Sequence, residues 1–315
     1  MITTVTLNPS IDREYFVNLE GENDNHFIYE PEDLKVYPGG KGVLSAINLK
    51  NIGYQDVQNI GFIGGKQGLF FEKMVQEYRV TTNYVYTKNE MRNNIKLVGK
   101  NLAKMVYYND YTYRVDKRDV EELKKRFKRG ITDSKLIMIS GSIPEGVDFG
   151  IYRDLVKICH NLDKKVYLQA SGEALKQALE AEPEFVVPYF KHTNKILDVE
   201  VNSMDDYVRM GRELLEAGAD SVILPYKCDR LLFSGSRVYS LSPEGLCLRS
   251  WLGAGDAYNA AFFDFIFQNG YDFLEANRYA GAAALDIAEG RIIFLDGRDR
   301  IEENIKRIIV EELEV

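Results

Sequence analysis

Short apolar runs alternate along this chain with longer segments whose apolar residues recur with helical spacing. A short apolar run bounded by turn residues is typical of a buried β-strand, and the longer pattern is typical of an amphipathic helix. Strands are predicted at Ile2–Leu7, Gln58–Ile63, Leu136–Ser140, Val166–Ala170, Phe185–Val187 and Ser221–Leu224. Helices are predicted at Lys41–Asn51, Leu69–Glu77, Lys117–Phe127, Phe149–Asn161, Gly172–Glu180, Met204–Ala217, Asp256–Asn269, Leu274–Glu289 and Arg298–Glu312.

This alternation of strands and helices predicts the fold class. We expect a doubly wound α/β fold, with a mostly parallel sheet and helices on both of its faces. No internal repeat or low-complexity linker interrupts the pattern, so the prediction is a single domain over residues 1–315. In open sheets of this kind, ligands bind outside the carboxyl ends of the strands.

Two stretches depart from the α/β alternation. Residues 13–36 and 91–115 alternate polar and apolar positions with period two and contain many aromatic and β-branched residues. We interpret them as two insertions that form a small antiparallel sheet beside the main body. Exposed Tyr and Phe on such a sheet would suit a lid or a dimer surface. Ordinary hairpins packed on the core are the equally open alternative.

Composition and charge narrow the classes of function. The net charge of −8 over 315 residues argues against a nucleic-acid binder, although it leaves room for a small anion. The chain has neither a run of about 18 apolar residues nor the pattern of a signal peptide, so no membrane association is expected. Cys159, Cys228 and Cys247 are odd in number and widely spaced, which predicts a reducing, cytoplasmic environment.

A glycine turn near the C-terminus carries the strongest chemical signal. Gly253-Ala254-Gly255-Asp256 precedes a segment of small and apolar residues that is predicted to be helical. Backbone N–H groups of such a turn point outward at the positive end of the helix and form an anion site. Asp256 in the first turn would then be placed to take a proton from a hydroxyl group near a bound phosphate. For this motif alone, a tight turn with Asp256 as N-cap remains the alternative.

Three further segments bring polar groups to predicted strand ends. Thr6–Asp12 closes the first strand, and Asp12 there can accept hydrogen bonds from two sugar hydroxyls. Pro38–Gly42 opens a helix with three glycines and Lys41, which permits close approach of the backbone to a polar ligand. Ser140–Gly146 ends another strand with small residues and a hydroxyl group. Together these segments predict a polar ligand site at one edge of the sheet.

The chain also resembles a known family. The segments that carry the resemblance are Thr6–Asp12, Gly39–Gly42, Arg92–Lys96, Ser140–Gly146, Ser171–Leu175 and Gly253–Asp256. In this order they resemble the ribokinase-like carbohydrate kinases of the phosphofructokinase B group, and within it the 1-phosphofructokinase and tagatose-6-phosphate kinase branch. The resemblance covers nearly the whole chain and implies a doubly wound α/β body with a β-sheet lid.

The resemblance also implies roles for particular residues. Those implied at the sugar are Asp12, Gly39, Gly40 and Lys41, and those implied near the phosphate of the substrate are Arg92, Asn94, Lys96 and Ser142. Asp256 would be the general base, while the amides of Gly253, Ala254 and Gly255 would stabilise the transferred phosphoryl group. Without the resemblance, a solvated face of a lid strand would be the preferred interpretation of Arg92 and Lys96, and a turn that of Ser142.

The departures from the family pattern concentrate on the nucleotide side. The family has Lys-Pro-Asn and a nearby Glu, tied to the metal and nucleotide phosphates, where this chain reads Val187–His192. Lys227 and Arg230 stand where a loop is expected to contain glycines, and Gln169 replaces a usual aspartate. On the sugar side, Leu44 replaces an asparagine. ATP and Mg²⁺ are the implied cofactors, but no metal ligands can be assigned.

Two hypotheses about function remain. The preferred one is an ATP-dependent kinase of a ketohexose monophosphate, such as fructose 1-phosphate or tagatose 6-phosphate, because Asp256 and its turn are intact. Lys227, Arg230 and Asn259 are then the candidates for contacts with the nucleotide. The alternative is a relative without catalytic activity that binds a sugar phosphate as a sensor or regulatory protein. In either case the β-lid could pair two copies of the chain in a homodimer.

Overall fold

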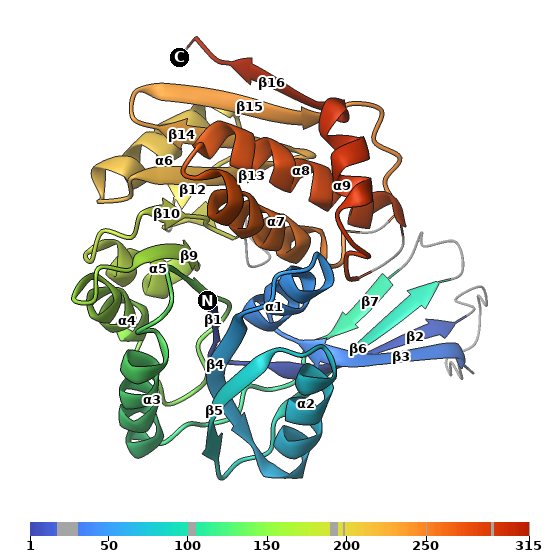
Figure 1. The fold of residues 1–315 in the computed structure, drawn as a ribbon, viewed down its shortest axis with the longest axis vertical. Helices are drawn as coiled ribbons and strands as arrows, with labels where there is room; N and C mark the ends of the chain where they lie inside the picture. Colours follow the sequence, from blue (N-terminus) through green and yellow to red (C-terminus); the bar gives the residue numbers. More distant parts are fainter. Residues whose placement is uncertain are drawn as a thin grey trace.

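A large sheet runs through the molecule, and a second, four-stranded sheet projects from its side (Figure 1). The computed structural model describes residues 1–17, 31–99, 105–189, 195–197, 199–249, 251–290 and 293–314. The ten strands of the large sheet lie in the order β16-β15-β14-β13-β10-β9-β8-β1-β4-β5. Their bounds, in that order, are Ile308–Glu312, Arg237–Pro243, Asp229–Ser234, Ser221–Tyr226, Phe185–Val186, Lys165–Gln169, Leu136–Ser140, Ile2–Thr6, Val57–Gly64 and Thr81–Thr87.

The large sheet is parallel from β13 to β5 and antiparallel at the edge formed by β14, β15 and β16. Successive residues of its strands enter two different cores: Leu136 and Met138 pack on one face, Ile137 and Ile139 on the other. Burial on both faces explains why these strands appear in the sequence as continuous apolar runs. The predicted mostly parallel α/β fold is confirmed.

Helices cover both faces of the large sheet. One face packs against α1 (Lys41–Asn51), α2 (Gly65–Glu77), α7 (Ala254–Asn269), α8 (Phe273–Gly290) and α9 (Asp299–Asn304). The other packs against α3 (Lys117–Gly130), α4 (Ile151–His160), α5 (Gly172–Leu179) and α6 (Met204–Glu216). A two-stranded ribbon, β11 (Lys195–Ile196) with β12 (Val199–Glu200), lies apart. Over the described ranges, no helix combines the length and apolar character needed to cross a bilayer.

The predicted C-terminal helix is wrong in its second half. The helix α9 ends at Asn304, a single 3₁₀ turn follows at Ile305–Arg307, and Ile308–Glu312 forms β16 against β15. Ile308, Ile309 and Val310 are consecutive β-branched residues, which favour a strand wherever a sheet edge is available to pair with. The apolar spacing that predicted a helix could not reveal that edge, because β15 and its neighbour β14 were themselves missed.

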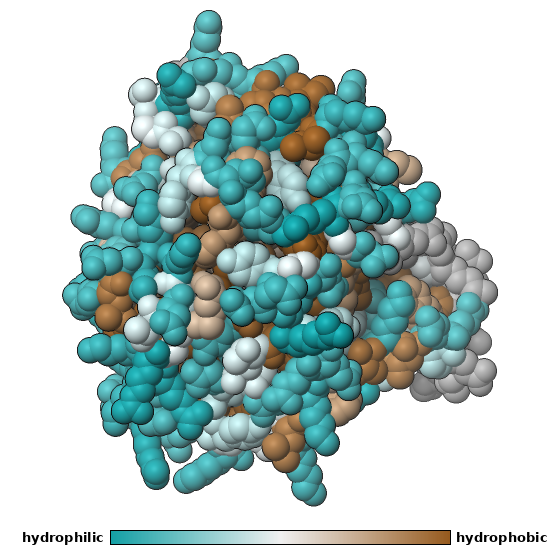
Figure 2. Space-filling view, viewed as in Figure 1, coloured by the Kyte–Doolittle hydropathy of each residue, from teal (hydrophilic) through white to brown (hydrophobic). Residues whose placement is uncertain are grey.

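The small sheet contains the two segments that were predicted to form it. Its order is β3 (Pro31–Gly39), β2 (Ser10–Val17), β6 (Arg92–Gly99), β7 (Met105–Tyr108). Residues 18–30 and 100–104 of these segments lie outside the described residues. The prediction of a purely antiparallel sheet is wrong, because the central strands β2 and β6 pair in parallel. The face seen in Figure 2 is mainly hydrophilic, with apolar side chains gathered over the base of this sheet.

Candidate active site

A cavity of about 720 Å³ lies at the carboxyl ends of β1 and β8, between the small sheet and the first turn of α7. Small-molecule sites commonly have volumes of roughly 300–1,000 Å³. The predicted site residues that line this cavity are Asp12, Gly40, Lys41, Arg92, Asn94, Lys96, Ser142, Gly253, Gly255 and Asp256. Motifs from both ends of the sequence therefore meet at one site, as predicted.

The remaining predicted residues lie around this cavity. Gly39 lies directly behind Asp12, and a side chain at Gly39 would collide with the Asp12 carboxylate. Ala254 and Arg230 line a separate, smaller pocket. Lys227 and Asn259 line neither of these two cavities.

Asp12 is the centre of a buried hydrogen-bond network on the small sheet. Its Oδ1 accepts from Ser10 Oγ at 2.7 Å and from Asn94 Nδ2 at 2.9 Å, while its Oδ2 forms an ion pair with Lys96 Nζ at 2.8 Å. Lys96 Nζ also donates to the Tyr37 hydroxyl at 2.7 Å. A carboxylate held by this many donors has a fixed orientation before any ligand arrives. Asp12 therefore presents its remaining lone pairs to the cavity in one geometry.

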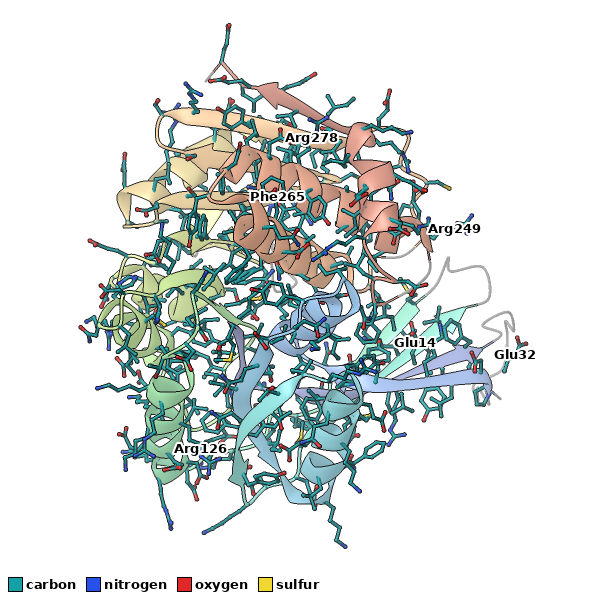
Figure 3. All side chains as sticks on the ribbon, viewed as in Figure 1. Glu14, Glu32, Arg126, Arg249, Phe265 and Arg278 are labelled. Carbon is teal, nitrogen blue, oxygen red and sulfur yellow. The ribbon has the colours of Figure 1, made fainter. Side chains whose placement is uncertain are left out.

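A second carboxylate on the same strand adds negative charge to this region. Glu14 is 5% exposed and lies near the base of the small sheet, whereas Glu32 is at its outer end (Figure 3). Burial raises the pKa of Glu14, and the positive charges of Lys96 and Lys35 partly offset that rise. Lys96 thus lies between two buried acids, which explains how a lysine with 9% exposure can remain inside the protein.

Arg92 and Ser142 meet through a residue that the sequence analysis did not single out, Asn8. Arg92 donates to the Asn8 carbonyl at 3.2 Å and to Asn94 Oδ1 at 3.3 Å, while Asn8 Nδ2 donates to Ser142 Oγ at 3.0 Å. Within the described part of the chain, Arg92 Nε and Asn8 Oδ1 are buried without a hydrogen-bond partner. Burial lowers the pKa of the Arg92 guanidinium, which nevertheless stays charged. A half-buried cation with an unused donor is suited to bind an anion.

Asp256 lies in the first turn of α7, on the opposite wall of the cavity. Its side chain is 8% exposed, and its Oδ1 has no partner among the described residues. The pKa of Asp256 is raised to about 6, mainly by burial. The positive charges of Lys41 and Lys96 oppose this rise, and the negative charge of Asp12 adds to it. The alternative role of Asp256 as N-cap is wrong, since the helix is capped at Gly253 with no side-chain hydrogen bond.

The backbone around Asp256 adopts the turn that the glycines predicted. Gly253 has a left-handed φ of 81°, and a side chain there would collide with the Ile293 carbonyl. The amide of Ala254 donates to the Trp251 carbonyl at 3.3 Å, and those of Asp256 and Ala257 donate to the Gly253 carbonyl at 3.0 and 2.9 Å. Among the described residues no backbone hydrogen bond occupies the amides of Gly253 and Gly255, so these two, and not that of Ala254, are the candidates for an anion at this turn.

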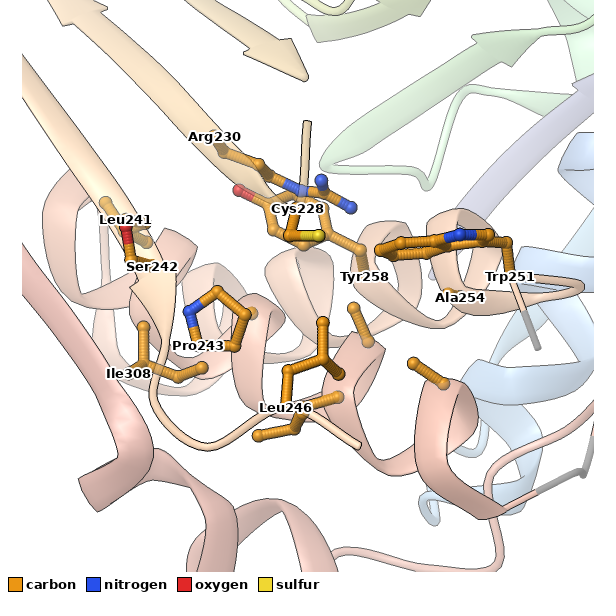
Figure 4. A pocket seen from close by; sticks show the side chains of 14 residues that line it. Cys228, Arg230, Leu241, Ser242, Pro243, Leu246, Trp251, Ala254, Tyr258 and Ile308 are labelled. Atoms are coloured by element: carbon orange, nitrogen blue, oxygen red, sulfur yellow. The ribbon is translucent and has the colours of Figure 1, made fainter. Parts of the chain in front are cut away.

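A small apolar pocket of about 50 Å³ adjoins the other side of this turn (Figure 4). Trp251 lines both cavities and so marks where they meet. The Arg230 guanidinium lies directly over the Tyr258 ring, 4.2 Å from its centre, in the lining of this pocket. Lys227 occupies the turn between β13 and β14 with a φ of 53°, the left-handed conformation that a glycine would adopt without strain.

Aromatic and amide side chains occupy the positions where the family pattern has metal-linked groups. Tyr189 lines the large cavity, and Lys41 Nζ lies 5.1 Å from the centre of its ring. Gln169 accepts from Asn259 Nδ2 at 3.0 Å, and Asn259 Oδ1 accepts from the Tyr167 hydroxyl at 2.6 Å. Residues 190–194 lie outside the described residues.

The residues present do not fit a Mg²⁺ site held by the protein. Mg²⁺ prefers carboxylate oxygens in octahedral geometry. The cavity is lined by three carboxylates, but Asp12 is paired with Lys96 and Asp110 accepts from the backbone amides of Asn93 and Tyr111. Asp256 is thus the single acid of the cavity on the α7 side, and no cluster of three metal-binding side chains occurs in the described ranges.

Comparisons with known proteins show which family the chain is similar to. The sequence profile of the pfkB family carbohydrate kinases matches residues 6–290. A 1-phosphofructokinase of Bacillus subtilis is 30% identical over 264 residues, which cover 83% of this chain and 84% of that protein. A 1-phosphofructokinase of Borreliella burgdorferi is 26% identical over 285 residues, 90% of each chain.

Solved structures show the same fold. A Thermotoga maritima protein described as a possible 1-phosphofructokinase has a TM-score of 0.92 and 27% identity over the full length of both chains. Escherichia coli phosphofructokinase-2 in complex with fructose-6-phosphate has a TM-score of 0.84 at 21% identity, covering 97% of this chain and 98% of that one. The chain belongs to the pfkB family of carbohydrate kinases.

Proposed function

We propose that this protein transfers the terminal phosphoryl group of ATP to a hydroxyl of a ketohexose monophosphate, with Asp256 as general base. The observation that carries the proposal is the Asp256 carboxylate, which is buried, has an unpartnered oxygen in the described structure and lines the same cavity as Asp12 and Arg92. Two relatives named 1-phosphofructokinase favour fructose 1-phosphate over tagatose 6-phosphate.

The acceptor is oriented by the small-sheet side of the cavity. The Asp12 carboxylate accepts hydrogen bonds from sugar hydroxyls in the geometry that Asn94 and Lys96 impose on it. Arg92 Nε and the neighbouring Ser142 hydroxyl bind the phosphate that the sugar already carries. This places the free hydroxyl of the sugar on the Asp256 side of the cavity.

Transfer then requires the movement of one proton and one phosphoryl group. Asp256 takes the proton of the attacking hydroxyl as the new bond forms between the sugar oxygen and the terminal phosphorus. At the same time the bond from that phosphorus to the leaving ADP breaks. The amides of Gly253 and Gly255 donate to the oxygens on which charge develops. The remaining part of the nucleotide extends over the first turn of α7, toward Trp251 and the apolar pocket.

The test is a kinase assay with ATP across sugar monophosphates, for the wild-type protein and Asp256→Asn. We expect turnover with a ketohexose monophosphate and a loss of about 10²–10⁴-fold in the variant. Asp229→Asn, at the tip of the β13–β14 hairpin, is the matched control and should retain the wild-type rate. Equal rates for wild type and Asp256→Asn would reject Asp256 as the base.

A second candidate function is a protein that binds sugar phosphate without catalysis. Two observations favour it. The apolar pocket of about 50 Å³, in which Arg230 lies on Tyr258, is small for a purine. In addition, Gln169 replaces a carboxylate of the family pattern. This candidate predicts a thermal shift with sugar phosphate and none with ATP. A ligand at about 100 times its Kd should stabilise the protein by roughly 2.7 kcal/mol.

The small sheet is a proposed dimer surface. Val106, Tyr107 and Tyr108 on β7 and Leu34 on β3 are exposed apolar side chains of this sheet. A solved phosphofructokinase-2 of E. coli is described as tetrameric in an inhibited form. Sedimentation of the wild type and of Tyr108→Glu tests the pairing, since a charged residue in such an interface should shift the population toward monomer.

A further inference from the structure

The first turn of α7 has a cation on either side of it, Lys41 in the cavity and Arg230 in the adjoining apolar pocket, where metal-dependent phosphate binding would need carboxylates. We infer that the phosphates of the donor are bound directly by the side chains of Lys41 and Arg230, and that ATP binds to this protein without a divalent cation. The inference rests on the proposed function for the identity of the donor. It concerns a different property, namely what neutralises the charge of that donor.

First, the described residues around the first turn of α7 offer few ligands for a metal ion. Val187–Ile196 contains no Asp or Glu. Gln169, in place of the family aspartate, is a neutral amide whose oxygen is already engaged by Asn259. Asp256 is left as the acid on this wall, and its carboxylate is needed to accept a proton. Mg²⁺ at nucleotide sites is usually held by one or two protein carboxylates besides the phosphates, and with Asp256 acting as the base no described carboxylate of this wall remains for it.

The second argument is the position of Lys41. It begins α1, and α1 contacts the first turn of α7 through Ser45, whose hydroxyl donates to the Asp256 carbonyl at 3.2 Å. Lys41 lines the same cavity as Asp256, and its positive charge is the largest influence that lowers the pKa of Asp256. Lys41 forms a cation–π contact with the Tyr189 ring and, within the described residues, has no ion pair with a carboxylate. Its N–H donors therefore remain available to a phosphate.

The third argument is the position of Arg230. Its guanidinium lies over Tyr258, two residues beyond Asp256 on α7, and lines the apolar pocket beside Trp251 (Figure 4). Among the described residues it too forms no ion pair. Arg230 also has a side-chain hydrogen bond with Tyr258, but a guanidinium carries several further N–H donors and can still donate two parallel hydrogen bonds to one phosphate. Lys41 and Arg230 thus flank the first turn of α7 on both sides.

The experiment is calorimetric titration of the protein with ATP in Mg²⁺ buffer and in buffer with excess EDTA. We expect the two dissociation constants to agree within about threefold. Lys41→Met and Arg230→Met should each weaken metal-free binding by about 10–100-fold, the effect of one charge-assisted contact. Thermal melting of each variant verifies that it is folded.

Matched controls exist for both substitutions. The control for Lys41 is Lys66, which also follows a glycine pair at the start of a helix, α2, but lies outside the cavity. The control for Arg230 is Arg237, an exposed arginine on β15, the strand that pairs with β14. Lys66→Met and Arg237→Met should leave the affinity for ATP unchanged.

Three outcomes would overturn the inference: ATP binding that requires Mg²⁺, ATP binding that is absent in both buffers, or equal losses in the control variants. Failure of the proposed function gives a different pattern, in which ATP still binds in EDTA but no sugar monophosphate is phosphorylated. The two results are therefore separable.

Discussion

The two walls of the cavity hold their charged groups in different ways. On the small-sheet wall the charges satisfy one another, as in the pair of Asp12 with Lys96 at 2.8 Å. Around the first turn of α7 the cations rest against aromatic rings: Lys41 on Tyr189 in the cavity, and Arg230 on Tyr258 in the adjoining apolar pocket. The small-sheet wall follows the family pattern at Asp12 and Arg92, whereas the α7 side keeps Gly253–Asp256 but departs from the pattern at Tyr189 and Arg230.

This difference has a physical consequence for ligand binding. Groups locked by mutual hydrogen bonds are preorganised, so they select one arrangement of hydroxyls with little loss of entropy. A cation held by a ring keeps its N–H donors free and loses little on exchanging the ring for a phosphate, because an exposed cation–π contact contributes only about 0.5–1 kcal/mol. The small-sheet wall is thus built for recognition, and the α7 wall for holding charge.

The largest expected effect comes from breaking the ion pair of the small-sheet wall. Lys96→Met leaves the Asp12 carboxylate buried without its counter-charge, which should reduce the free energy of unfolding by about 3–5 kcal/mol in urea denaturation. The double variant with Asp12→Asn should recover a large part of that loss. Lys35→Met, which removes an exposed lysine from the same sheet, is the control and should change stability little. Equal losses at Lys96 and Lys35 would contradict the preorganised network.

A smaller effect of opposite sign is expected at Asp256. Its folded pKa of about 6 lies above the ordinary 3.8, so the buried charge costs stability at neutral pH. Asp256→Asn should therefore raise the free energy of unfolding at pH 8 by about 2–3 kcal/mol. This advantage should shrink as the pH falls from 6 to 4, where the wild-type carboxyl becomes protonated. A stability difference independent of pH would show that burial does not raise this pKa.

The sequence predicted most of the residues on both walls but few of their contacts. Asp12, Arg92 and Asp256 were recognisable because they lie in short motifs of the family pattern, although Asp12 and Arg92 lie on β2 and β6 of the small sheet and Asp256 in the first turn of α7. The ion pair of Lys96 with Asp12 depends on β2 pairing with β6 in parallel. Strand register is set by tertiary packing, so the local pattern could not give it.

The donor side was predicted less well, for a related reason. The sequence showed that the expected Asn, Glu and glycines were missing, but not what replaced them. Tyr189 and Tyr258 gained their significance only from the cations that lie on their rings, and these contacts join segments far apart in the chain. The strand β16 was missed likewise, because its partner β15 is distant in sequence.

At Arg92 we expect an effect on ligand binding of intermediate size. Arg92→Ala removes a charged donor whose Nε is buried and unpartnered among the described residues. Binding of the sugar phosphate should weaken by about 10–100-fold, while binding of the unphosphorylated sugar should change little. Calorimetry with both ligands makes the comparison. If both ligands weaken alike, Arg92 supports the packing of the small sheet and does not contact the phosphate.

The smallest expected effect concerns the neutral network behind the α7 wall. Tyr167→Phe removes the hydroxyl that donates to Asn259 Oδ1 at 2.6 Å and should cost about 1 kcal/mol of unfolding free energy. Tyr152→Phe, which loses a buried hydroxyl bonded to the Gly141 carbonyl at 3.1 Å, is the control of similar cost. Neither variant should change the affinity for ATP. Gln169 stands where the family has an aspartate, but its side-chain oxygen is bonded to Asn259, so we expect it not to contact ATP. A tenfold change in ATP affinity for Tyr167→Phe alone would instead place Gln169 and Asn259 in contact with the nucleotide. In that case both walls would bind their ligand through preorganised hydrogen bonds, and they would differ only in charge.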